Sequence, residues 1–198
     1  MINVLIMYHP NFASAGKFER KLTKILSTLD DYQILYFADP ASLISNFFDS
    51  KSLKLLGDNV AHGSIVQDEK LTHAVIFDSV SSPEFTTIKS SLSEMIPVRY
   101  IQDKITFVSN KDKGDYFDTY IGRGTLWGNP YAIGQDGDRE EVIRKFSYDF
   151  NRGFLRGGKN FNEKLKALRG HTLGCHCKPY ACHGDVLADY LNKLDDGE

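Results

Sequence analysis

The sequence predicts an α/β protein with a Rossmann-like parallel-sheet N-terminal half and a smaller, mixed α/β C-terminal domain. Two observations predict this architecture. Short, continuously apolar segments alternate with amphipathic ones over residues 1–101, which is typical of strand–helix–strand units with right-handed crossovers. A polar connection follows over residues 102–119, and residues 120–198 contain all three cysteines and the only tryptophan. We therefore expect the second domain to begin at residue 120.

Strands and helices are expected to alternate in the N-terminal half. Apolar runs predict strands over residues 4–8, 33–37, 73–77 and 97–101. Apolar residues at helical spacing predict a helix over residues 17–29, and a second over residues 84–95 with one face formed by Phe85, Ile88, Leu92 and Met95. A further helix is expected over residues 40–56, because Pro40 suits its first turn and Gly57 its end.

Shorter elements are expected after residue 101. Strand candidates cover residues 105–108, 116–117, 131–133 and 173–177, with a turn over 111–115. Asp138, with Glu141 three residues later, predicts a helix start. That helix continues through apolar residues at three- and four-residue spacing and stops at a glycine pair: Val142, Phe146, Phe150, Phe154 and Gly157-Gly158. Two more helices are expected over residues 161–168 and 183–194.

The totals exclude several classes of protein. The net charge of −2 provides no global basic field for nucleic acid. The first eight residues lack a positive n-region and a cleavage site, so they predict a strand rather than a signal peptide. No apolar run approaches the roughly 20 residues of a membrane span. Three cysteines within eight positions form a poor disulfide framework, so we expect reduced thiols and a cytoplasmic protein.

Two segments, Thr72-His-Ala-Val-Ile-Phe-Asp-Ser79 and Ile96-Pro-Val-Arg-Tyr-Ile101, flank the predicted helix over 84–95. They resemble the closing strand–helix–strand unit of the SLOG superfamily, whose Rossmann-like domains bind nucleotides and related ligands. The resemblance spans residues 1–101. The chain departs from that family where a Gly-Gly ligand loop would follow the second strand, since Ala38-Asp-Pro40 stands there instead. A scaffold or partner-binding role for this half is the alternative.

The cysteines and their neighbouring histidines form a candidate metal site. Cys175 and Cys177 would point to one face of a strand, and the turn after Cys177 can return Cys182 to the same place. Three thiols and a histidine are a common zinc set, so we expect zinc at Cys175, Cys177, Cys182 and His183. His171 and His176 compete as the fourth ligand. The plain alternative is that reduced cysteines pack as small apolar side chains.

A reactive thiol is a third interpretation of the same stretch. Cys182 precedes the last predicted helix, whose N-terminus favours a thiolate. His183 is a candidate base beside it, and Asp185 completes a candidate catalytic set. Asp185 equally suits a helix-capping role.

A glycine-rich stretch upstream is the candidate ligand-binding loop: Gly122, Arg123, Gly124, Thr125, Trp127, Gly128 and Asn129. Glycines let backbone amides approach an anion closely. Arg123 offers a planar charged fork for phosphate or carboxylate, and Trp127 a face for stacking. Asn129 offers donors and acceptors for a polar edge. A plain turn is the alternative, and we expect this stretch to share one site with the cysteines.

The two stretches together carry a second resemblance. Tyr120-Ile-Gly-Arg-Gly-Thr-Leu-Trp-Gly-Asn-Pro130 and Leu173-Gly-Cys-His-Cys-Lys-Pro179, followed by Cys182-His-Gly-Asp-Val-Leu187, closely resemble a bacterial and phage family, domain of unknown function 4326. The resemblance covers about residues 107–194. That family usually has an aromatic residue where this chain has His176. The resemblance implies a compact domain whose glycine, Asn-Pro and Cys/His elements share one site, in a phage or conflict-related protein.

These observations lead to two function hypotheses. The first is binding or processing of a nucleotide-like small molecule, through N-glycosidic or phosphate chemistry, in the cytoplasm of a host cell. The second is a non-enzymatic phage-type protein that binds and modulates a host protein or nucleic acid, with a structural Cys/His cluster. Both are compatible with a homo-oligomer. Residue types alone do not decide whether the protein is an enzyme.

Overall fold

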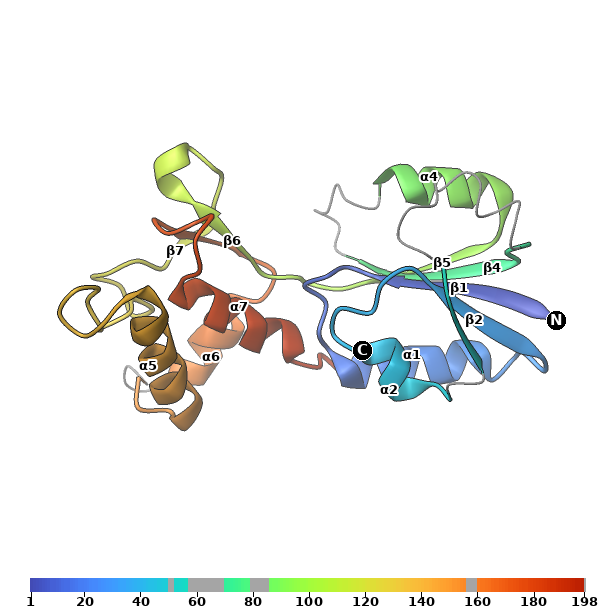
Figure 1. Cartoon of the computed structure of the whole chain (residues 1–198), viewed down its shortest axis with the longest axis horizontal. Helices are drawn as coiled ribbons and strands as arrows, with labels where there is room; N and C mark the ends of the chain where they lie inside the picture. Colours follow the sequence, from blue (N-terminus) through green and yellow to red (C-terminus); the bar gives the residue numbers. More distant parts are fainter. Residues whose placement is uncertain (50–51, 57–69, 79–85, 156–159, 198) are drawn as a thin grey trace. The chain divides into compact units, whose positions relative to one another are not determined.

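The computed structural model describes residues 1–49, 52–56, 70–78, 86–155 and 160–197 (Figure 1). The chain divides into two compact units. The N-terminal unit comprises residues 1–103 together with 193–198, and the C-terminal unit comprises residues 104–192. The last residues of the chain therefore belong to the same compact unit as the first domain.

A five-stranded, fully parallel sheet forms the N-terminal unit, in the order β3-β2-β1-β4-β5. The strands are β1 (Ile2–Tyr8), β2 (Tyr32–Tyr36), β3 (Leu53–Leu55), β4 (His73–Asp78) and β5 (Val98–Gln102). Leu5 of the central strand lies opposite both Leu35 and Ala74, and these three side chains are buried. This sheet confirms the predicted Rossmann-like α/β fold.

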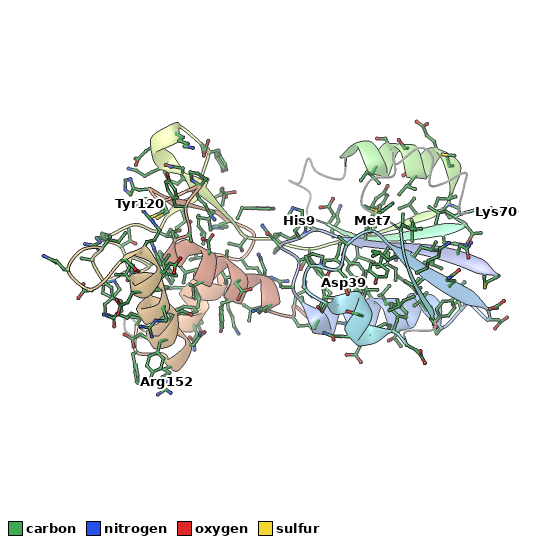
Figure 2. All side chains as sticks on the ribbon, in the orientation of Figure 1. Met7, His9, Asp39, Lys70, Tyr120 and Arg152 are labelled. Carbon is green, nitrogen blue, oxygen red and sulfur yellow. The ribbon has the colours of Figure 1, made fainter. Side chains whose placement is uncertain are left out.

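Helices cover both faces of this sheet. They are α1 (Ala15–Leu26), α2 (Leu43–Phe47) and α4 (Thr86–Met95). Helices α1 and α2 lie on one face and α4 lies on the other (Figure 1). Ile88 and Leu92 of α4 pack into a core cluster that contains Met7 (Figure 2). Met95, expected on the same face, is 47% exposed at the end of the helix, and Phe85 lies outside the described residues.

The predicted helix over residues 40–56 is wrong. Among the described residues of this range, α-helix is confined to α2. At the start of α2, the Asp39 carboxylate accepts hydrogen bonds from the backbone N–H groups of Ile44 and Ser45 at 3.0 and 2.8 Å. The helix ends at Phe48, whose backbone is extended. Leu53 then pairs with β2 as part of edge strand β3. The leucines on either side of Lys54 follow the two-residue period of a strand, which the helix prediction ignored.

Charged side chains attach the end of the chain to α1. Lys17 is 3% exposed, and its Nζ lies 3.2 Å from Asp103 and 2.6 Å from Asp196. Arg20 donates two hydrogen bonds to the Asp195 carboxylate, at 2.7 and 3.0 Å. These ion pairs bring residues 195–196 into the N-terminal unit.

The C-terminal unit is a small mixed α/β domain. Its parallel sheet has the order β6-β8-β7. The elements are β6 (Phe107–Asn110), the 3-10 helix η2 (Lys111–Lys113), β7 (Thr119–Tyr120), α5 (Arg139–Arg152), α6 (Phe161–Lys166), β8 (Thr172–Cys175) and α7 (His183–Lys193). Residues 102–119, expected as a connection, thus contribute a strand to this unit. Strands β6 and β7 begin two and three residues later than expected.

Helix α5 begins as predicted. The Asp138 side chain accepts a hydrogen bond from the Glu141 backbone N–H at 2.8 Å. The helix ends earlier than predicted, at Gly153, whose positive φ of 75° terminates it. Phe154 consequently lies beyond the helix and is 69% exposed, and the predicted stop at Gly157-Gly158 lies outside the described residues.

The short strand predicted over residues 131–133 is also wrong. The Ala132 carbonyl accepts hydrogen bonds from the backbone N–H groups of Gln135 and Asp136, so this segment forms a turn. In the part of the chain that the structure describes, no helix is long and apolar enough to cross a membrane.

Candidate functional site

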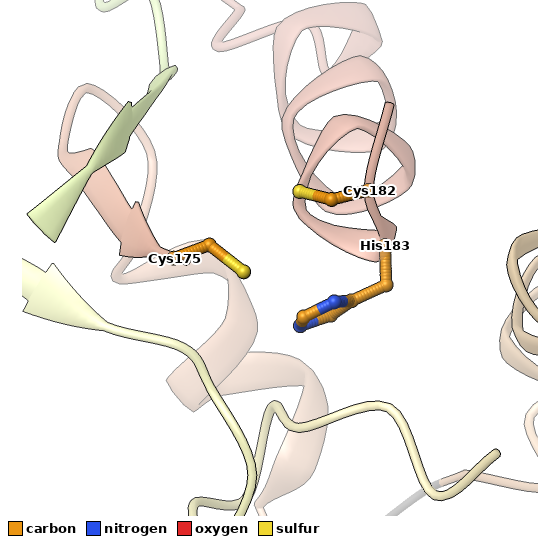
Figure 3. A group of neighbouring side chains, drawn as sticks. All are labelled: Cys175, Cys182 and His183. Atoms are coloured by element: carbon orange, nitrogen blue, oxygen red, sulfur yellow. The ribbon is translucent and has the colours of Figure 1, made fainter. Parts of the chain in front are cut away.

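The end of β8 and the start of α7 bring two cysteines and a histidine together. Cys175 is the last residue of β8, Cys182 directly precedes α7, and His183 is its first residue. Their side chains converge on one point (Figure 3). One sulfur or nitrogen atom of each lies within 4.8 Å of the other two, and all three residues are buried. These three side chains could therefore hold a metal ion together.

Cys177 lies beside this group. Its sulfur is 3.9 Å from the Cys175 sulfur, as the one-residue spacing predicts, and its side chain is half-buried. It does not share the mutual 4.8 Å separation of the other three residues. Three of the four predicted metal ligands thus form one cluster, and the fourth contacts only one of its members.

A backbone carbonyl fixes the His183 ring. His183 Nε2 lies 2.9 Å from the Ile121 carbonyl oxygen, which can only accept a hydrogen bond. Nε2 therefore carries the hydrogen, and Nδ1 retains the lone pair in the neutral ring. The ring also contacts Phe146 edge-on, with centroids 5.2 Å apart. A buried imidazole held in this way can act as a metal ligand or as a base through Nδ1.

The thiols differ in their acidity. The pKa of the Cys175 thiol is lowered to about 5, chiefly because the Cys182 thiol donates a hydrogen bond to it. That hydrogen bond and burial raise the pKa of Cys182. Burial raises the pKa of Cys177. Of the three thiols, Cys175 is therefore the one whose thiolate the surroundings favour.

Asp185 caps the helix start. Its carboxylate accepts a hydrogen bond from the Cys182 backbone N–H at 2.9 Å and forms an ion pair with Lys178. The Gly184 backbone N–H points to the Cys182 sulfur at 3.3 Å. The structure thus gives Asp185 the helix-capping role that the sequence offered as an alternative to a catalytic one.

The glycine-rich stretch forms a tight loop that is stabilised by hydrogen bonds of its own polar side chains. Thr125 Oγ1 donates to the Gly122 carbonyl at 2.8 Å. Asn129 accepts from the Tyr131 backbone N–H at 2.9 Å and donates to α5. Arg123 donates from Nη2 to the Tyr131 carbonyl at 2.7 Å, and its side chain is exposed. This hydrogen bond directs the Arg123 guanidinium toward the Tyr131 carbonyl.

The loop and the cysteine cluster line one cavity of about 320 Å³. Its walls come from β7, the loop, α5, β8 and the start of α7. The lining residues are Tyr120, Gly122, Arg123, Asn129, Tyr131, Ile133, Val142, Cys175, His176, Cys177, Cys182 and His183. Among the described residues that line it, none is a carboxylate. The two stretches that the sequence singled out therefore meet at one cavity.

The predicted ligand-binding residues divide into two groups. Gly122, Arg123 and Asn129 line the cavity. The others support the loop: Gly124, Thr125, Trp127 and Gly128. Among them, the Trp127 ring packs against Phe161, with centroids 5.4 Å apart. Trp127 thus has a packing contact with Phe161 and is not among the residues that line this cavity, so its stacking role stays a prediction.

Sequence reasoning missed a polar network in the cavity wall. His176 Nδ1 lies 2.6 Å from an Asp112 carboxylate oxygen, and His176 Nε2 lies 2.8 Å from the Tyr120 hydroxyl. Tyr131 is the other aromatic residue of the wall. The position of Tyr120 next to the glycine-rich stretch was an available signal. The contact with Asp112 was not predictable, because it depends on the order of β6, β8 and β7.

Comparisons with known proteins cover both units. Residues 1–109 match the family described as the minimal SLOG domain, and residues 108–193 match the family described as domain of unknown function (DUF4326). The chain is also similar to an uncharacterized 12.4 kDa protein in the nrdA-td intergenic region of Enterobacteria phage T4. The two are 48% identical over 88 residues, which are 44% of this chain and 78% of that protein. No solved structure matches the chain.

Proposed function

Because the chain belongs to the minimal SLOG domain family through residues 1–109 and to the DUF4326 family through residues 108–193, we propose that it binds and processes a nucleotide-like ligand. The binding site is the cavity of the C-terminal unit. The observation that carries the proposal is that Arg123 and the Cys175 thiol line the same cavity of about 320 Å³. A cavity of this size suits a ligand at the small end of the range that proteins enclose.

The charges of the cavity favour an anionic ligand. Arg123 stands at the wall with one of its five donors used on the Tyr131 carbonyl, and a guanidinium fork matches phosphate geometry. The described lining residues include no carboxylate that would repel phosphate. We therefore assign the phosphate group of the ligand to Arg123 and the adjacent Gly122 backbone.

The remaining wall suits a ring. Tyr120 and Tyr131 supply aromatic surface, and Asn129 and His176 supply polar edges. Aromatic side chains of this kind stack on flat bases and discriminate little between different bases. In this proposal the base lies against the tyrosines and the scissile bond faces the cysteine cluster.

The cysteine cluster supplies the chemistry of the proposed reaction. A thiolate on Cys175 is a nucleophile. Cys175, Cys182 and His183 together are also residue types that bind zinc. N-glycosidic and phosphate chemistry each need a group that stabilises charge at the bond being broken. We propose zinc as the cofactor. The three free thiols and the phage relative support action in the cytoplasm of a host cell.

Ligand binding by the full chain tests the proposal. Isothermal titration with nucleoside mono-, di- and triphosphates and with dinucleotides should identify a ligand. The Arg123→Ala variant should bind it about tenfold to a hundredfold more weakly, because a hydrogen-bonded charge pair is lost. Chromatography of the products would then show whether a free base or phosphate is released.

Arg144→Ala is the matched control for this experiment. Arg144 lies on α5, its side chain is 76% exposed, and it pairs only loosely with Glu141 at 3.6 Å. Equal weakening in both variants, or no binding by the wild-type protein, would refute the site. A stable complex with a host protein and no turnover would favour the alternative, a binding protein with a structural Cys/His cluster.

A further inference from the structure

We propose that Cys175, Cys182 and His183 bind one zinc ion whose fourth coordination position faces the cavity. The location of the open position rests on the proposed function, because the nucleotide-like ligand is assigned to the same cavity. Binding of the metal itself does not require that the nucleotide-like ligand be present. An open site differs in function from a closed one: it gives the ion direct contact with water or with an anionic group of the ligand.

The distances within the cluster fit a tetrahedral ion. Zinc lies about 2.3 Å from a thiolate sulfur and about 2.0 Å from a histidine nitrogen, so its ligand atoms lie roughly 3.5–4 Å apart. In this structure those atoms all lie within 4.8 Å of one another. The side chains of Cys175, Cys182 and His183 already point toward a common space, as a shared ion requires (Figure 3).

The surroundings of His183 match those of a zinc ligand. Zinc-bound histidines usually donate their second ring N–H to a carbonyl or a carboxylate. The Ile121 carbonyl accepts from Nε2 at 2.9 Å, which leaves Nδ1 for the ion. Because Ile121 directly precedes Gly122, the same backbone segment orients the zinc ligand and one wall of the cavity.

The charge of the cluster also favours a dication. Cys175 and Cys182 are 3% and 2% exposed, so two thiolates there would lack the solvation that water provides. The Gly184 N–H, 3.3 Å from the Cys182 sulfur, and the start of α7 stabilise only part of that charge. A zinc ion would neutralise both thiolates at once.

Whether the site is open or closed depends on whether Cys177 is a fourth ligand. If it were the fourth ligand, the ion would be enclosed by four protein groups, as in structural zinc sites. Its sulfur contacts Cys175 at 3.9 Å but lies outside the cluster that includes Cys182 and His183. Two cysteines and one histidine with a position open to a cavity are the ligand pattern of catalytic zinc.

Metal content of the full chain is the first test. The protein is purified with a reductant and reconstituted with zinc or cobalt alone, and bound metal is measured after removal of excess. We expect one ion per chain. Cys175→Ser, Cys182→Ser and His183→Ala should each lose at least about 90% of the metal at a concentration that saturates the wild type. Cys177→Ser and His171→Ala are the matched controls and should keep it.

The cobalt-loaded wild-type protein tests the open position without any variant that might fail to fold. Its visible spectrum should show tetrahedral thiolate coordination and should change on addition of azide or inorganic phosphate. Loss of metal in Cys177→Ser to the same extent as in Cys182→Ser, together with a spectrum that anions leave unchanged, would show a closed structural site and overturn the proposal. Absence of stoichiometric metal in the wild type would also overturn it.

These outcomes are separable from those of the proposed function. A protein that binds nucleotides through Arg123 but holds no metal would refute only the zinc site. A protein that holds zinc with an anion-sensitive spectrum but binds no nucleotide would refute only the ligand class.

Discussion

Gly122 belongs to the glycine-rich loop, lines the cavity and directly follows Ile121, whose carbonyl contacts His183. A Cβ atom at this position would lie 2.1 Å from the Tyr120 hydroxyl oxygen and 2.3 Å from its ring carbon Cζ. The Tyr120 ring is held in place by the hydrogen bond to His176 and by Lys111, whose Nζ lies 5.0 Å from the ring centroid. The absence of a side chain at Gly122 is therefore what allows Tyr120 to form the cavity wall.

We predict that Gly122→Ala lowers the free energy of unfolding by about 1–3 kcal/mol, because the added methyl group displaces the Tyr120 ring. Urea denaturation of the full chain measures this change. The double variant Tyr120→Ala/Gly122→Ala should lose less stability than the sum of the two single variants, since the clash is removed with the ring. Strict additivity would show that the methyl group meets some other obstacle.

Single residues also show which features of the site a sequence pattern can predict. The types and spacing of the cysteines predicted that Cys175, Cys182 and His183 lie together, but the predicted set also included Cys177, which lies outside the cluster. The aromatic character of Trp127 did not reveal that its ring packs against Phe161, 34 positions later in the chain. Residue types predict the chemistry that a side chain offers, but its partners depend on tertiary packing that no local pattern encodes.

At the scale of elements, α1 and the end of the chain form one stabilising unit. Arg20 pairs with Asp195 on the surface, and Lys17 pairs with Asp103 and Asp196 in the interior. Gly16 allows this approach, since a Cβ there would lie 2.4 Å from an Asp195 carboxylate oxygen. Ion pairs with α1 therefore hold the segment that follows α7, in addition to any apolar packing.

We predict an acid-sensitive contribution from this contact. Arg20 lowers the pKa of Asp195 to about 2, below the value of about 3.9 expected in the unfolded chain. The resulting stability is therefore fully present above about pH 4 and is lost as the pH falls toward 2. Because the pair is partly exposed, with side-chain exposures of 39% and 37%, solvent screening should keep this contribution small.

Unfolding free energies measured between pH 2 and pH 6 would test this contribution. Asp195→Asn and Arg20→Gln should each flatten the same part of the curve, and the double variant should add little to either. Variants that shift the curve uniformly, with no change in its shape, would contradict the assignment to Asp195.

The elements were predictable where one pattern dominated. The buried strands of the first sheet and the Asp138 cap of α5 were recognisable from sequence because local and tertiary preferences agree there. The segment that holds α2 and β3 was not, because its leucines and phenylalanines satisfy a helical period and a strand period at once. Pairing with β2 decides between them, and that pairing is not local.

At the scale of the whole molecule, each unit has its own sheet and its own buried core. The proposed zinc ligands and every residue that lines the cavity belong to the C-terminal unit. Zinc that binds only the folded form of this unit would stabilise it by mass action, by about 4 kcal/mol at a free concentration about a thousand times the Kd.

This placement predicts that chelation acts on one unit only. After treatment with a chelator, hydrogen exchange should accelerate in β8 and the first turns of α7, which carry Cys175 and His183, and in α5, whose Phe146 packs against the His183 ring. Exchange in β1 and β4 should stay unchanged, because the core around Leu5 contains no residue of the site. The Cys177→Ser variant should respond to the chelator as the wild type does. Faster exchange throughout both sheets would mean that the ion stabilises the chain as one cooperative body, and unchanged exchange everywhere would mean that the cysteines contribute to stability without a metal.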